Sequence, residues 1–77
     1  MKHLNPIVCF EIDLVKVDNT NKRILKTSER FLIEKYASLQ ECSKSVRNRI
    51  KRAKTEHYHG KVILRRHSGD EEIVKEF

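Results

Sequence analysis

The sequence predicts an α+β domain: an antiparallel sheet of about four strands, in the order β-β-α-β-β, covered on one face by a single amphipathic basic helix. Three observations predict this fold. Extended apolar runs lie on both sides of one stretch with helical periodicity, and polar turn signals separate those runs. At 77 residues, the chain has room for a single domain, residues 1–77, with a small core.

The first extended run, residues 6–17, is apolar on both faces. Alternation places Val8, Phe10, Ile12 and Leu14 on one face and Ile7, Cys9, Val15 and Val17 on the other. One helix can cover only one of these faces. We therefore expect a homodimer through the first strand or its outer face to cover the second.

The second part of the sheet is less sharply defined. Residues 18–21, Asp-Asn-Thr-Asn, are a strong turn signal. Extended runs follow at residues 22–26 and 31–36, and Thr27, Ser28 and Glu29 lie between them. This pattern fits either one bent strand or two.

Two further strands are predicted after the helix. Residues 61–66 contain Val-Ile-Leu, residues 67–70 have the composition of a hairpin turn, and residues 71–77 close the sheet. A connection over residues 56–60 precedes them, and we expect Gly60 to be its tight point.

The helical stretch has the clearest signal in the chain. Its apolar residues recur with spacings of 3, 4, 4 and 3 and are Leu39, Cys42, Val46, Ile50 and Ala53. Ser38 precedes Glu41 by three residues, which is the pattern of a capping box. Because the apolar phase never slips, we predict one unbroken helix from about residue 39 to residue 54.

Positive charge is concentrated in one part of the chain. The net charge is +6, and residues 44–66 hold nine basic residues against Glu56 alone, whereas residues 1–43 are close to neutral. Residues 67–77 carry a net charge of −3. A positive field confined to one helix and the strand after it indicates a polyanionic partner.

Two segments resemble the small modular DNA-binding domains, of helix-turn-helix type, that are attached to homing endonucleases. Residues 5–13 are similar to the first strand of that module, and residues 31–45 to its second strand and first helix. Residues 59–61, His-Gly-Lys, resemble its closing strand. The resemblance implies that Arg47, Arg49, Lys51 and Arg52 read DNA. It departs from the family at Val46 and Arg47, where no turn interrupts the helix.

These observations favour a small, non-enzymatic nucleic-acid-binding module that uses a basic helix on the phosphate backbone, with DNA favoured over RNA. The predicted contact residues are Lys44, Arg47, Asn48, Arg49, Lys51, Arg52 and Lys54 on the helix, with Arg65 and Arg66 at the rim. The main alternative is a small phage or mobile-element interaction protein, an inhibitor that binds an acidic or nucleic-acid-binding surface of a host protein.

A third interpretation is a small ribonuclease toxin. In it, His57, His59 or His67 would serve as acid or base, and Arg65 and Arg66 would stabilise the phosphorane. His57 and His59 with Cys9 or Cys42 would also be a conceivable zinc site, but the spacing of structural zinc ligands is missing. We expect no metal and no cofactor.

Two cysteines and the hydropathy pattern indicate the compartment. Cys9 and Cys42 lie in apolar patterns and are expected to be buried thiols in a reduced cytosol. No apolar run is long enough to cross a membrane, and no secretory signal is seen. We therefore expect the protein in the cytoplasm of a bacterial cell, without a membrane partner.

Overall fold

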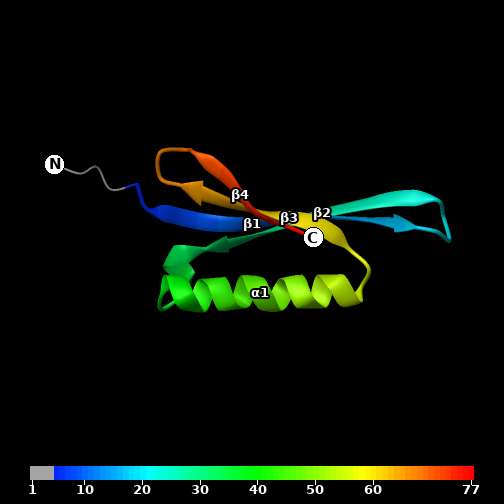
Figure 1. Cartoon of the computed structure of the whole chain (residues 1–77), viewed down its shortest axis with the longest axis horizontal. Coiled ribbons are helices and arrows are strands. Elements are labelled where there is room, and N and C mark those ends of the chain that lie inside the picture. Colours follow the sequence, from blue (N-terminus) through cyan, green and yellow to red (C-terminus); the bar gives the residue numbers. More distant parts are fainter. Residues whose placement is uncertain (1–4) are drawn as a thin grey trace.

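The computed structural model describes residues 5–77 and has one sheet and one α-helix (Figure 1). The elements are β1 (Ile7–Asp18), β2 (Arg23–Leu32), the short 3-10 helix η1 (Ile33–Lys35), α1 (Leu39–Thr55), β3 (His59–Arg66) and β4 (Glu71–Glu76). All neighbouring strands are antiparallel, in the order β2-β1-β3-β4. The predicted fold class and the unbroken helix are confirmed.

The core lies between α1 and one face of the sheet, as the single helix running along the sheet in Figure 1 shows. Its buried residues are Phe10, Ile12, Leu14, Phe31, Cys42, Val46, Ile50, Ala53, Val62 and Leu64. Tyr36 and Tyr58 are half-buried against this cluster, as expected for tyrosines at the ends of elements. We call the opposite side of the sheet the open face.

A β-bulge in β1 corrects the predicted faces of its first residues. Ile7 pairs with Arg66 and Cys9 with Arg65, so Val8 is an extra residue without a partner in β3. Such an insertion reverses the alternation on its N-terminal side. Ile7 therefore packs against the core and Val8 is exposed, the reverse of the prediction, whereas Phe10, Ile12 and Leu14 face the helix as expected.

Residues 22–36 form one strand followed by a single turn of 3-10 helix. β2 passes through Thr27 and Ser28 without a break because both pair with β1, at Leu14 and Asp13. The long partner strand thus overrides the weak β-propensity of this segment. The predicted strand at residues 31–36 is wrong beyond Leu32, where the chain turns into η1.

Gly60 has a role different from the predicted one. It lies inside β3, which begins at His59, two residues before the predicted start. A Cβ atom at this position would lie 2.2 Å from the backbone oxygen of Asp13. Glycine is therefore needed for the close approach of β3 to β1, and the turn after α1 is made by His57, whose φ is 67°.

The two cysteines are free and buried, as predicted. Cys9 lies on the open face and Cys42 in the core, where burial raises the pKa of its thiol. β1 is hydrogen-bonded to β2 on one side and to β3 on the other. A second copy of the chain therefore cannot add a strand to β1, and of the predicted dimer only the outer-face arrangement remains geometrically open.

Candidate nucleic-acid interface

Local sequence signals fix where α1 begins and which of its sides faces solvent. The Ser38 hydroxyl accepts a hydrogen bond from the Glu41 N–H at 3.1 Å, which caps the helix as the sequence predicted. Cys42, Val46, Ile50 and Ala53 are buried against the sheet. The remaining sides of α1, including most of its cations, therefore face outward.

Four of these cations form one row, which we call the basic stripe: Lys44, Arg47, Lys51 and Lys54. At about 100° per residue, they lie roughly 80° to 160° around the helix from the buried residue Val46. All four side chains are exposed. Within residues 5–77, none of them forms an ion pair with an acidic side chain. The stripe is thus a row of charges available to a partner.

Two more predicted residues lie on the adjacent side of α1. Asn48 and Arg52 are exposed. Arg52 Nε is 3.9 Å from Glu56 Oε1, but both side chains are largely in solvent, so this pair is weak and can open. Both residues remain accessible beside the stripe.

Arg49, in contrast, is used inside the fold. Its Nε donates to Glu29 Oε2 of β2 at 2.8 Å, and only 14% of its side chain is exposed. The pair joins α1 to the edge strand. Sequence periodicity places Arg49 beside the apolar face but does not reveal this partner 20 residues away. We therefore remove Arg49 from the set of free cations.

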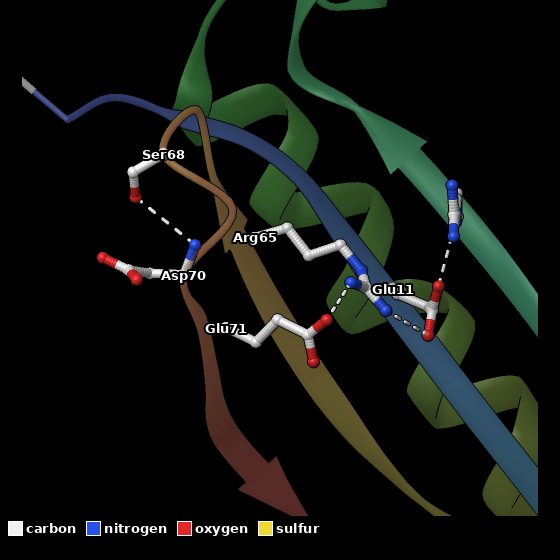
Figure 2. A network of polar contacts seen from close by, with 6 residues as sticks. Glu11, Arg65, Ser68, Asp70 and Glu71 are labelled. Carbon is white, nitrogen blue, oxygen red and sulfur yellow. Dashed lines mark hydrogen bonds and ion pairs between the residues drawn. The ribbon is translucent and has the colours of Figure 1, made fainter.

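Arg65 is held on the open face, away from α1. Figure 2 shows its guanidinium between the carboxylates of Glu11 and Glu71. The distance from Arg65 Nη2 to Glu11 Oε2 is 3.3 Å, and Arg30 Nε reaches the other oxygen of Glu11 at 2.9 Å. These contacts raise the pKa of Arg65, first through the hydrogen bond with Glu11. Arg65 is therefore neither on the helix side nor unpaired.

Arg66 occupies a third location. Its Nη1 donates to the backbone oxygen of Asn5 at 3.2 Å, and the side chain is partly buried. In the sheet, Arg66 of β3 is the cross-strand partner of Ile7, at the start of β1. The structure thus separates the two rim arginines from each other, since alternation along β3 directs them to opposite faces.

The electrostatics of the open face centre on Glu11, which is buried although its face carries no helix. Burial alone raises the pKa of Glu11, but the hydrogen bonds from Arg30 and Arg65 outweigh it and leave this pKa below its ordinary value. Asp13 has the opposite shift: burial, reinforced by the neighbouring Glu11, raises its pKa. The ion pairs therefore stabilise the charge of Glu11, whereas the charge of Asp13 has no ion-pair partner within residues 5–77.

The structure separates two of the three histidines of the ribonuclease interpretation from its arginines. His59 begins β3 and Arg65 and Arg66 end it, which separates them by about 20 Å at the usual rise per residue. His57 lies in the turn before β3, at the His59 end. His67 is next to the arginines, but the guanidinium of Arg65 is engaged by two carboxylates.

The histidines and cysteines of the zinc alternative are also apart. Cys9 is paired with Arg65, at the end of β3 opposite His59. Cys42 lies in the first turn of α1, and His57 follows its last turn. Among residues 5–77, no three His, Cys, Asp or Glu side chains gather closely enough to hold a metal ion.

Sequence reasoning missed a second basic region. Lys22, Arg23 and Lys26 lie at and near the turn between β1 and β2 and are exposed. Residues 1–43 are close to neutral as a whole, so the net charge of this part of the chain did not reveal them. The signal was present within residues 15–26, which hold four basic residues and only Asp18 as an acid.

No protein-family model, no curated protein and no solved structure significantly matches this chain. Within residues 5–77, no helix combines the length and the apolar character that crossing a membrane requires.

Proposed function

We propose that this protein binds nucleic acid without catalysing a reaction, through contacts of the basic stripe of α1 with backbone phosphates, and with DNA favoured over RNA. One observation carries the proposal: Lys44, Arg47, Lys51 and Lys54 are exposed on one side of a well-anchored helix and have no acidic partner within residues 5–77. Asn48 and Arg52 extend this surface.

The dimensions of the stripe support a phosphate contact. Lys44 and Lys54 are ten residues apart, which is about 15 Å along an α-helix. Each strand of a duplex carries a phosphate about every 3.4 Å along its axis, so a 15 Å row of charges faces several phosphates. The cations sit on a helix held by its buried face, so little order has to be gained on binding.

The test is fluorescence anisotropy with a random duplex DNA, a single strand and an RNA hairpin across a salt series. For about three engaged cations, log affinity for the duplex falls against log salt with a slope near −3. The double variant Arg47→Ala/Lys51→Ala lowers that slope by about 2 and weakens all sequences alike. Its thermal stability stays near the wild-type value because both residues lie off the buried face.

The matched control is Lys35→Ala/Lys61→Ala, which removes two charges away from α1 and should leave the slope almost unchanged. If the wild-type protein binds none of the three nucleic acids at about 50 mM salt, the proposal fails. The alternative of an interaction protein with an acidic partner surface then takes its place.

A further inference from the structure

A pocket of about 460 Å³ lies beside the C-terminal end of α1 and is lined by Lys54, His57, Tyr58, His59, Glu76 and Phe77. This volume is in the range of small-ligand sites. Gly60 and Phe77 exchange backbone hydrogen bonds of 2.8 and 2.9 Å, so the two residues are directly paired. Gly60 also pairs with the core residue Leu14, which places Phe77 on the helix side of the sheet. Figure 1 shows the C-terminus above the C-terminal half of α1.

The side chains of the pocket on the helix side are aromatic or basic. His59 and Glu76 are the cross-strand partners of Val15 and Lys61, so their side chains belong to the open face. The other side chains of the lining are those of Lys54, His57, Tyr58 and Phe77. Both aromatic rings are half-buried, so each keeps some exposed surface. Among the lining residues, all within residues 5–77, no acidic side chain lies on the helix side.

The pocket lies at the end of the basic stripe and on the same flank of α1. Lys54 is the last residue of the stripe, and its Nζ is 5.8 Å from the centre of the Phe77 ring. On the opposite flank, Arg49 reaches Glu29 of β2. Since β2 and β4 are the two edges of the sheet, the stripe and the pocket share the β4 edge. A nucleic-acid strand that follows the stripe towards the end of α1 therefore arrives at the two rings.

The two rings differ in how firmly they are engaged. Lys16 Nζ lies 4.7 Å from the centre of the Tyr58 ring and also donates to the backbone oxygen of Glu56 at 3.2 Å, so this cation is fixed over Tyr58. The contact of Lys54 with Phe77 is longer, and Lys54 is exposed. A charge-assisted hydrogen bond to a phosphate is stronger than a cation–π contact near its distance limit. Lys54 can therefore turn to a phosphate and leave the Phe77 ring to a base.

We infer that this pocket takes an unpaired base of single-stranded DNA, which stacks on the Phe77 ring while Lys51 and Lys54 contact the neighbouring phosphates. The inference rests on the proposed function and names single-stranded DNA as the substrate class. Stacking on an aromatic side chain accepts any base, because every base has a π-face. A paired base lies inside the duplex stack and reaches such a pocket only after it has been extruded.

Charge complementarity favours a nucleotide over a second copy of this chain. A ligand for rings beside lysines combines a planar apolar group with negative charge, and a nucleotide has both. A second copy carries a net charge of +6 and would bring like charges to Lys51 and Lys54.

Two strands of equal length separate base stacking from phosphate binding: an oligothymidine, and an abasic strand that keeps the phosphates without the bases. In fluorescence anisotropy at equal salt, the wild-type protein should bind the oligothymidine about tenfold more tightly. Phe77→Leu keeps an apolar side chain against the core but removes the ring. It should reduce this preference to less than about twofold and leave the salt slope unchanged.

Two control variants complete this comparison. Phe77→Tyr retains an aromatic ring in the pocket and should keep the preference for the oligothymidine. Tyr36→Leu removes a half-buried ring that precedes α1, at the other end of the helix, and should keep the preference as well. The stripe variant Arg47→Ala/Lys51→Ala should lower the salt slope for both strands, because it removes phosphate contacts.

Phe77→Trp provides a second measurement, since the chain contains no other tryptophan. The oligothymidine should quench the indole emission, and the abasic strand at saturation should not. Equal affinity of the wild-type protein for the two strands, a retained preference in a folded Phe77→Leu variant, or equal quenching would overturn the assignment of the pocket. The slope of the stripe variant would still test the proposed function. A wild-type protein that binds neither strand and no duplex refutes both.

Discussion

Glu11 and Asp13 show how two carboxylates on one strand come to differ. They are two residues apart in β1 and lie on the same open face. Glu11 is hydrogen-bonded to Arg30 and Arg65, whereas Asp13 pairs across the sheet with Ser28 and Lys61 and forms no ion pair within residues 5–77. The charge of Glu11 is therefore stabilised in the folded state, and that of Asp13 is not.

The raised pKa of Asp13 predicts that Asp13→Asn stabilises the protein at pH 7. Above its folded-state pKa, ionised Asp13 opposes folding; below the unfolded-state value, near 3.8, both states are protonated and this penalty vanishes. The gain in urea midpoint should therefore be present at pH 7 and shrink towards pH 4. Glu34→Gln, at an exposed acid, is the control. A variant less stable than wild type at pH 7 would contradict the prediction.

At the scale of elements, α1 depends on its narrow apolar face. Only 6% of Val46 is exposed, at the centre of the contact with the sheet, whereas Asn48 two residues later faces solvent. Arg49 and Glu29 add a polar link between α1 and β2 at the flank. The position of the helix cations therefore depends on the packing of the buried row Cys42, Val46, Ile50 and Ala53 against the sheet.

Val46→Asp should unfold the domain, since it places an unpaired charge in the contact between helix and sheet at a cost of several kcal/mol. Asn48→Asp introduces the same group on the exposed side and should change the free energy of unfolding by less than about 0.5 kcal/mol. Urea titrations followed by circular dichroism compare the two. An unchanged midpoint for the Val46 variant would mean that this face is not the core.

At the scale of the whole molecule, one chain covers more of its open face than alternation alone suggests. The bulge at Val8 moves Ile7 to the core side, and Cys9 and Ile63 are buried on the open face. Val15, Val17, Ile24 and Ile73 remain exposed there. The reason for expecting a homodimer thus rests on these four side chains and no longer on Ile7 and Cys9.

Because the chain carries a net charge of +6, we expect a monomer in the absence of nucleic acid. Sedimentation velocity at high micromolar concentration should give the mass of a single 77-residue chain, because the positive charges of two copies repel each other at moderate salt. A dimer that persists at both low and high salt would contradict this expectation and restore the outer-face arrangement.

The sequence by itself determined the local features of this protein. The period of α1, its Ser38 cap and the turn at residues 18–21 depend on neighbouring residues, so they can be read directly from the chain. The same holds for the exposed cations Lys44, Arg47, Lys51 and Lys54, whose side of the helix follows from the buried row. Element order and class follow from these signals.

Only the tertiary structure decided which charges are free and which segments project. Arg49 and Arg65 are engaged by Glu29 and Glu11, which are 20 and 54 residues away, and no local pattern encodes such pairs. The bulge at Val8, and the extension of paired β1 and β2 beyond Val15, arise from where β3 pairs with β1. Periodicity assigns a residue to a face, but long-range pairing determines what lies opposite it, and that decides which cations remain available to a partner.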